Sequence, residues 1–448
     1  MLPLLLILRF GVTFYPSGPI RSIDVYYNRV YLLYEDGLVI LDRTGDRRVS
    51  SISIPGGRLT IFDPEYGDLY ILTEDKILRY HEGSEHLFEV TLGGKRVDRI
   101  GVGKNYLYLD TKSGYYCLRK GSCVIKPTTT VKADRWQSEL EPAELHRYPI
   151  LTPYYRTDNL LNHYPITALT RSRNRLYVGS DLGIEIYNLL SGEKKNITTG
   201  PIEPVLKISD LDTLIGFISR RKISFFSPSG DTWFYRSFLH DLIDVTSNRN
   251  YLYLATKGGL FSIGSGITLP IFKSPILTIK KTGDIIYLFA ESQLFALPPY
   301  ANRPFKIITY PGEVRDLAVY ENKIYIGSDQ GLFVLDSLMG GEELIDPRGY
   351  IKFGVDDLLA QDRLYIVADG HLIAYKDSFQ YLNVNDATSL ASGSNRIWIG
   401  TESGLWFYQD GNINKCYDLP RVRVYSILEK DHHLWAATTR GLYRVRID

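Results

Sequence analysis

The sequence predicts an all-β protein, a β-propeller of about eleven to twelve four-stranded antiparallel blades. Three observations lead to this prediction. The first is a recurring phrase, as in KIYIGSDQGLFVL (323–335) and RIWIGTESGLWFY (396–408). The second is the alternation of apolar and polar residues within short runs, and the third is a glycine between the runs. Antiparallel units of roughly 40 residues are typical of propeller blades.

Composition agrees with this class of protein. Hydrophobic residues make up 44% and charged residues 23% of the 448 positions, which favours a large buried core. The chain holds 34 tyrosines and 38 glycines, residues that suit strands and tight turns. The formal net charge is +1, so we expect no nucleic-acid partner. No apolar run approaches the ~20 residues of a membrane helix, so no membrane span is predicted.

Residues 1–9 begin with MLPLLLIL and end at Arg9. This run resembles the apolar part of a signal peptide, without its basic start or its small-residue cleavage site, and we expect an exported protein. The alternative is a buried first strand. Residues 10–123 then hold the first three repeats. Their first strand, FGVTFYP (10–16), is expected to complete the last blade, because the last repeat reaches residue 448 after only three strands.

The repeat occurs eleven times, and its second strand contains one anchor residue in each copy. The anchors are Tyr31, Tyr70, Tyr108, Tyr177, Leu214, Tyr253, Tyr287, Tyr325, Tyr365, Trp398 and Trp435. Their spacing is 33 to 40 residues, except for 69 residues between Tyr108 and Tyr177. In one copy we expect strands at VRDLAVY, KIYIGS, GLFVLD and EELIDP (314–347). Glycines in the middle turn are expected at positive φ: Gly37, Gly114, Gly183, Gly259, Gly331, Gly370, Gly404 and Gly441.

Residues 124–163 depart from the repeat and form either an insertion or a degenerate blade, and residues 164–448 hold the other eight repeats. The blades could form one wide ring or two rings, one nested in the other. Two consecutive rings are disfavoured, because three blades before the interruption cannot close a ring. Cys117 and Cys123 flank a predicted turn and are either a cross-strand disulfide or two free thiols.

Two segments, 166–192 and 387–411, resemble the two-component-regulator propeller repeat, and YYRTDNLLNHYPITAL (154–169) resembles the lead-in of that family. The resemblance covers most of residues 20–448. It implies propeller blades in an extracytoplasmic bacterial protein, and it carries no catalytic residue.

Charged residues recur at one position of the predicted first strands. They are Arg99, Asp244, Asp316 and Asp357. Repeat symmetry would place them together on the wall of the central channel, where they could bind a cation or a basic peptide. The alternative is that these strand starts are simply hydrated. A second candidate surface, for a protein partner, is Trp136 with Tyr154 and Tyr155, which could instead pack on a neighbouring blade.

We find no nucleophile elbow, phosphate loop or metal-ligand spacing, so no cofactor, no metal and no catalytic residue is predicted. The sequence therefore favours a non-catalytic propeller that binds a protein or another ligand outside the cytoplasm. Two alternatives remain open. One is a lyase or hydrolase with its site at the channel mouth, and the other is a structural component of a surface assembly.

Overall fold

The computed structural model describes residues 6–7, 12–82, 86–140, 147–148, 151, 166–229, 232–248, 251–264, 267–299, 301–310, 312–336, 342–344, 351, 354–416 and 419–447. In these residues the chain forms eleven antiparallel sheets and no α-helix, which confirms the predicted fold class. No helix in this part of the chain is long and apolar enough to cross a membrane. The chain divides into two compact units, residues 1–202 and 203–448.

The first unit contains four sheets, each a meander that begins at its inner strand. The first sheet is β3 (Ile20–Tyr26), β4 (Arg29–Tyr34), β5 (Gly37–Asp42) and β6 (Arg48–Ser53). The second is β7 (Gly57–Asp63), β8 (Asp68–Thr73), β9 (Lys76–His81) and β10 (His86–Thr91), with β1 (Leu6–Ile7) paired to β10. The third is β11 (Val97–Val102), β12 (Tyr106–Thr111), β13 (Gly114–Arg119) and β14 (Ile125–Pro127), with β15 (Arg135–Ser138) paired to β11. The fourth is β16 (Ala168–Ser172), β17 (Arg175–Ser180), β18 (Gly183–Asn188) and β19 (Lys194–Ile197).

The second unit contains seven sheets. The first three sheets are β20 (Lys207–Leu211), β21 (Leu214–Ile218), β22 (Lys222–Ser227) and β23 (Thr232–Ser237); β24 (Leu242–Asn248), β25 (Tyr251–Thr256), β26 (Gly259–Gly264) and β27 (Ile267–Phe272); and β28 (Ile276–Thr282), β29 (Ile285–Ala290), β30 (Gln293–Leu297) and β31 (Phe305–Thr309). The next three are β32 (Val314–Tyr320), β33 (Lys323–Ser328), β34 (Gly331–Asp336) and β35 (Glu342–Leu344); β36 (Val355–Ala360), β37 (Leu364–Ala368), β38 (His371–Tyr375) and β39 (Phe379–Leu382); and β40 (Ala387–Ser392), β41 (Ile397–Thr401), β42 (Gly404–Gln409) and β43 (Asn412–Cys416). The strands of the last sheet in this unit are β44 (Val424–Lys430), β45 (His433–Thr438) and β46 (Gly441–Arg446).

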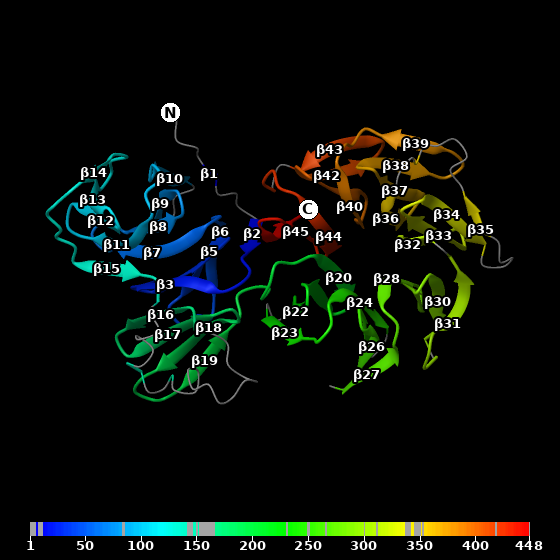
Figure 1. Ribbon diagram of the computed structural model, residues 1–448, viewed down its shortest axis with the longest axis horizontal. Coiled ribbons are helices and arrows are strands. Elements are labelled where there is room, and N and C mark those ends of the chain that lie inside the picture. The colour runs from blue at the N-terminus through cyan, green and yellow to red at the C-terminus, as the bar shows by residue number, and fades with distance from the viewer. Residues whose placement is uncertain are drawn as a thin grey trace. The chain divides into compact units, whose positions relative to one another are not determined.

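The seven sheets of the second unit close on one another. Their first strands contact in the order β20, β24, β28, β32, β36, β40 and β44, and β44 contacts β20. Figure 1 shows these strands toward the middle of the unit, with β23, β27, β31, β35, β39 and β43 at its rim. A single ring of all eleven blades is therefore not formed, because the circle closes after seven consecutive repeats. In the first unit the first strands contact in the order β16, β3, β7 and β11.

Neighbouring sheets are held together by buried apolar side chains from both faces. Between the sheets that start at β24 and β28, for example, Leu260 packs with Ile279 and Leu288, all of them fully or almost fully buried. Between the last and first sheets of this unit the ring of Trp435 lies 5.2 Å from that of Phe217. This face-to-face stacking explains the continuous apolar runs in the second and third strands, since a single sheet cannot bury both of its faces.

The recurring phrase is the turn between the second and third strands. In this turn a Ser or Thr hydroxyl donates a hydrogen bond to the carbonyl oxygen of the glycine three residues later, as from Ser328 to Gly331 (3.2 Å) and from Thr401 to Gly404 (2.9 Å). Gly331 has φ of +123°, as predicted. Gly37 is the exception, because its φ is not positive. A Cβ there would lie 2.2 Å from Cε1 of Phe14 in β2 (Val12–Tyr15), so close contact rather than turn geometry requires this glycine.

Residues 124–138 belong to the third sheet, where β14 is the fourth strand and β15 adds a fifth next to β11. The three cysteines are free. The register explains this for Cys117, which faces Lys126 and not Cys123 across the hairpin. The assignment of residues 10–16 as the closing strand stays a prediction.

Candidate functional site

The three aspartates predicted from the sequence occupy the same position of three first strands in the second unit. Each follows a β-bulge, and the strand register places Asp244 opposite Ala255, Asp316 opposite Gly327 and Asp357 opposite Val367. First strands line the inside of the circle of sheets, so these residues belong to its inner wall. The geometry therefore brings together the repeat positions that the sequence pattern singled out.

Two lysines that the sequence analysis did not select complete this cluster. Lys207 occupies the equivalent position in β20, and Lys280 lies in β28. The Nζ atom of Lys207 lies 2.5 Å from Oδ2 of Asp244. The Nζ atom of Lys280 lies 3.3 Å from Oδ2 of Asp316 and 3.4 Å from the carbonyl oxygen of Leu358. The available signals were a lysine at the same repeat position in PVLKISDL, and a lysine two residues beyond that position in ILTIKKT.

The carboxylates also join neighbouring sheets through the main chain. Oδ2 of Asp316 accepts a hydrogen bond from the N–H of Leu358 at 2.9 Å, and Oδ2 of Asp357 accepts one from the N–H of Leu390 at 2.7 Å. Asp244 accepts a hydrogen bond from the Ser209 hydroxyl of the preceding sheet at 2.8 Å. Each side chain thus links its own first strand to the first strand of an adjacent sheet.

Where the circle of sheets closes, a serine side chain links the first strands of two adjacent sheets. The Ser426 hydroxyl in β44 accepts a hydrogen bond from the N–H of Ile208 in β20 at 3.0 Å. The first unit repeats the device, because Oδ2 of Asp24 in β3 accepts a hydrogen bond from the N–H of Phe62 in β7 at 2.6 Å. This recurrence in both units identifies the contact as part of how sheets are joined.

Burial and charge shift the pKa values of this cluster. Burial, followed by the neighbouring Asp316 carboxylate, raises the pKa of Asp357 to about 7. Burial would also raise the pKa of Asp316, but the ammonium groups of Lys280 and Lys207 hold it below its usual value. Burial would lower the pKa of Lys207, and the carboxylates of Asp244 and Asp316 reverse this and raise it. Both lysines are therefore cations at neutral pH, and Asp357 shares a proton equilibrium with Asp316.

The alternative that these aspartates are simply hydrated strand starts is wrong for Asp244 and Asp316, which are only 7% and 6% exposed, whereas Asp357 is half-buried. The lysine side chains keep more solvent contact, 43% for Lys207 and 37% for Lys280. A solute that reaches the centre of the circle therefore meets ammonium groups more readily than carboxylates. The described residues contain no group of three His, Cys, Asp or Glu side chains arranged to hold a metal ion.

Arg99 lies in the first unit, in β11. Its guanidinium pairs with the carboxylate of Asp110 and lies 5.2 Å from the ring of Trp136. Trp136 is half-buried in β15, directly opposite Gly101, and its ring is 6.3 Å from that of Tyr115. Gly101 is needed there, since a Cβ would lie 2.9 Å from the indole. Trp136 thus packs on its own sheet, whereas Tyr154 and Tyr155 lie outside the described residues.

The strand β15 that carries Trp136 lies along the inner edge of the first unit. It pairs with β11, contacts β7, and its residue Arg135 forms an ion pair of 2.5 Å with the buried Asp24 of β3. Another buried ion pair in this unit joins Lys120 to Asp63 at 2.7 Å. Part of the segment that interrupts the repeats therefore acts as an inner strand that ties three sheets together.

No protein-family model matches the chain, and no curated protein is similar to it in sequence. Solved structures are similar in fold. The extracellular domain of a one-component system from B. thetaiotaomicron superimposes with a TM-score of 0.50 at 12% identity, covering 96% of this chain and 76% of that one. PorZ, a bacterial surface component of the type-IX secretion system of Porphyromonas gingivalis, gives a TM-score of 0.50 at 12% identity, covering 95% and 73%. The chain therefore has an all-β, multi-blade propeller fold that is similar to the folds of an extracellular domain and of a bacterial surface component.

Proposed function

We propose that this protein is a non-catalytic propeller that binds a protein partner outside the cytoplasm. The observation that carries the proposal is that the charged side chains of the inner strands are already bonded to one another and to neighbouring strands. Asp316 and Asp357 are each hydrogen-bonded to the main chain of the next sheet, and Asp244 and Asp316 are paired with lysines. Side chains held in this way act as links between sheets, which leaves the exposed loops and turns as the surface for recognition.

Two observations support a location outside the cytoplasm. The apolar start of the sequence resembles a signal-peptide core. Two of the solved structures with a similar fold are an extracellular domain and a bacterial surface component. The second of these also favours a related function, a structural component of a surface assembly, in which the bound partner would be another subunit of that assembly.

Localisation and crosslinking in the native cell test the proposal together. The full chain, tagged at its C-terminus, should be found outside the cytoplasm and should give a discrete crosslinked adduct with one partner protein. A chain that stays in the cytoplasmic fraction would contradict the proposed location. A chain that is correctly located but turns over a small molecule, with no adduct, would favour the alternative of an enzyme.

A ligand-binding role for the acidic positions stays a separate prediction. Calorimetry at low salt with Ca²⁺ and with a lysine-rich peptide tests it. If it holds, the triple variant Asp244→Asn, Asp316→Asn, Asp357→Asn should bind at least about tenfold more weakly than the wild type. Wild-type protein that binds neither probe would end this hypothesis and leave the linking role described above.

A further inference from the structure

One edge of the second unit carries two repeated positions that can be compared around the whole circle. The first is the turn between the second and third strands, and the second is the bulge residue at the start of the first strand. They are adjacent, because the start of each first strand pairs with the residue that precedes the turn, as Leu242 does with Thr256 and Val424 with Thr438. Main-chain hydrogen bonds confirm this, for instance from Lys257 N–H to the Asp241 carbonyl at 2.9 Å.

Charge is segregated at the turn position. Three successive sheets carry exposed cations there: Arg440 after β45, Arg220 and Arg221 after β21, and Lys257 after β25. The other four sheets carry exposed acids: Glu291, Asp329, Asp369 and Glu402. We call the part formed by the sheets that begin with β44, β20 and β24 the basic sector.

The cations of the basic sector are open to solvent. The side chains of Arg220, Arg221 and Lys257 are 74%, 59% and 68% exposed, and all three surround the single carboxylate of Asp241, at 3.3, 2.9 and 3.9 Å. One carboxylate cannot neutralise three cations, so this cluster keeps an excess of positive charge that attracts anionic groups.

Apolar side chains accompany this charge. The bulge position holds Tyr425 in β44, Leu277 in β28 and, by the same register, Leu206 just before β20, and all three are exposed. Leu239, in the loop that leads to β24, is 89% exposed. At the bulge position of three of the four acidic sheets stand Arg315, Asp356 and Thr388 instead, whereas the acidic sheet that begins with β28, next to the basic sector, carries Leu277. Large apolar side chains at this position thus lie in and next to the basic sector.

We propose that the basic sector binds a protein segment in which carboxylates alternate with apolar side chains. This inference rests on the proposed binding function and deepens it. Carboxylates would pair with the two arginines and Lys257, and the apolar side chains would cover Leu239, Leu206 and Tyr425. Exposed arginines beside leucines and a tyrosine form a surface that provides both charge complementarity and an apolar contact, the combination found in protein interfaces.

Two other partners fit this edge less well. A flat anionic bilayer would also meet the acidic sheets, whose exposed carboxylates Glu291, Asp329 and Asp369 would repel it. A second copy would match the charges when turned by two-fold symmetry, but most of the apolar residues would then face acidic sheets, three of which carry no apolar side chain at the bulge position. A short peptide occupies the basic sector alone.

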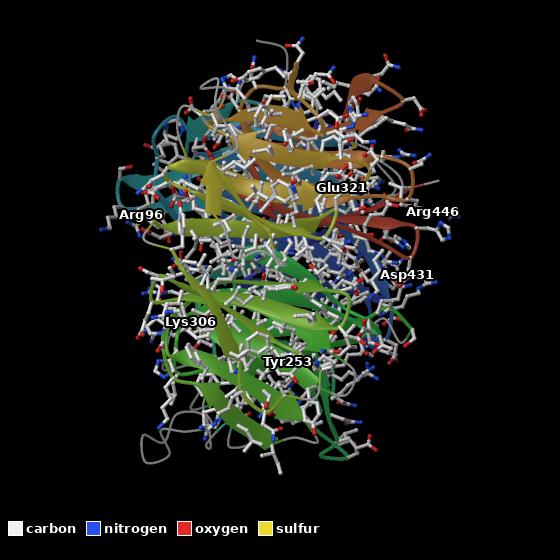
Figure 2. All side chains as sticks on the ribbon, turned by 90° about the vertical axis from the view of Figure 1, so that its right-hand side faces the viewer. Arg96, Tyr253, Lys306, Glu321, Asp431 and Arg446 are labelled. Carbon is white, nitrogen blue, oxygen red and sulfur yellow. The ribbon has the colours of Figure 1, made fainter. Side chains whose placement is uncertain are left out.

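Fluorescence anisotropy with the full chain tests the proposal. The probe is a labelled peptide of Glu and Asp interleaved with Leu and Phe, measured at low salt. The variant Arg220→Gln, Arg221→Gln, Lys257→Gln should weaken its binding at least about tenfold. The control Arg303→Gln, Lys323→Gln, Lys376→Gln removes the same charge from turns on the opposite edge of the sheets and should bind as the wild type does. Figure 2 labels two residues in turns of this opposite edge, between the first and second strands of a sheet. They are Glu321, two positions before Lys323, and Asp431 in the last sheet, and both labels lie in the right-hand half of the view.

The apolar part of the proposal has its own test. A peptide with the same carboxylates but Ser in place of Leu and Phe, and the variant Leu206→Ser, Leu239→Ser with the original peptide, should each bind several-fold more weakly. Absence of peptide binding to the wild type, or equal loss in the control variant, would overturn the inference. Binding to phosphatidylserine vesicles that is lost in the Gln variant would assign the sector to a bilayer, and salt-sensitive dimerisation in sedimentation velocity would assign it to a second copy.

Site-specific photo-crosslinking in the native cell separates this inference from the proposed function. A photoreactive residue at Leu239 should give an adduct whose crosslinked segment is acidic and apolar, and one at Phe305 on the outer strand β31 should not. An adduct from Phe305 alone would overturn the inference and keep the proposed function. Failure of both positions, with no partner found by general crosslinking, would count against the proposed function itself.

Discussion

Asp316 and Leu358 connect two adjacent sheets, because Oδ2 of the aspartate accepts the hydrogen bond of the Leu358 main-chain N–H at 2.9 Å. The same oxygen atom lies 3.3 Å from Nζ of Lys280 in the preceding sheet. One buried carboxylate therefore links three first strands, β28, β32 and β36. Links of this kind set the relative position of sheets whose apolar faces could otherwise slide on each other.

The substitution Asp316→Ala should destabilise the second unit by about 2–4 kcal/mol, because it leaves a buried N–H and Lys280 without their partner. Chemical denaturation followed by tryptophan fluorescence measures this. The control is Asp356→Ala, which removes an exposed carboxylate paired with Arg315 in the preceding first strand and should cost less than about 1 kcal/mol. Equal costs would show that the link adds nothing to an ordinary surface ion pair.

The stability of the second unit should depend on the protonation of Asp357. Its pKa in the folded protein is raised to about 7, above the unfolded value of about 3.9. The proton therefore stabilises the folded state fully below about pH 4, and this stabilisation is lost as the pH rises toward about 7. The cause is burial next to Asp316, with Lys280 opposing it and the Leu390 N–H favouring the ionised form.

The variant Asp357→Asn resembles the protonated form and should lack this dependence. The difference in unfolding free energy between variant and wild type should be smallest at about pH 4 and should shift in favour of the variant by pH 8. Titrating groups that Asp357 does not affect, including Asp36 of the first unit, cancel in this difference because both proteins share them. A difference that is constant with pH would mean that Asp357 is ionised throughout.

The turn glycine Gly331 should resist substitution. Its φ of +123° strains any residue with a Cβ, and valine is β-branched, so Gly331→Val should cost about 1–3 kcal/mol. Gln330→Ala, in the same turn, should be nearly silent, because only the main-chain N–H of Gln330 bonds to the Ser328 hydroxyl. Thermal unfolding compares the two. The same loss from both would show that side-chain contacts, and not the backbone, define the turn.

Deletion of residues 1–17 should cause aggregation or a large loss of thermal stability. Within residues 203–448 the sheet that starts at β44 has three strands, whereas the other six have four. We expect residues 10–16 to supply the missing strand, since an uncovered edge pairs readily with other chains. The deletion also removes Phe14, whose N–H bonds to the Ser51 hydroxyl in β6. A truncated protein that stays monomeric with an unchanged melting temperature would refute the closing strand.

Much of the fold could be predicted because each strand of a blade repeats its own signal. The alternation seen in 314–320 and the turn from Ser328 to Gly331 recur in copy after copy. A strand that is ambiguous in one copy can therefore be assigned from the same position in another copy. Ring closure could not be predicted in this way. It depends on contacts such as that of Ile208 with Ser426, which join residues 218 positions apart and leave no periodic trace.

The site was only partly predictable for a similar reason. Repeat symmetry located Asp244, Asp316 and Asp357 at one position, and the register agrees. Their burial was not predicted, because it depends on pairing with Lys207 and Lys280 from other sheets. The sequence pattern considered at these strands did not include the lysines, so these partners were not identified. The sequence places Trp136 in a segment that is either an insertion or a degenerate blade, and its pairing with Gly101 across β15 and β11 makes it part of a sheet.

The central claim is that the inner charges join sheets and that the partner binds elsewhere on the surface. The most direct measurement compares in-cell crosslinking of the wild type with that of the variant Asp244→Asn, Asp357→Asn, which keeps hydrogen-bond acceptors but removes two charges. Circular dichroism and a melting curve first establish that the variant is folded. The account predicts the same partner adduct in the same yield. A folded variant that has lost the adduct would contradict it and make the inner cluster the binding site.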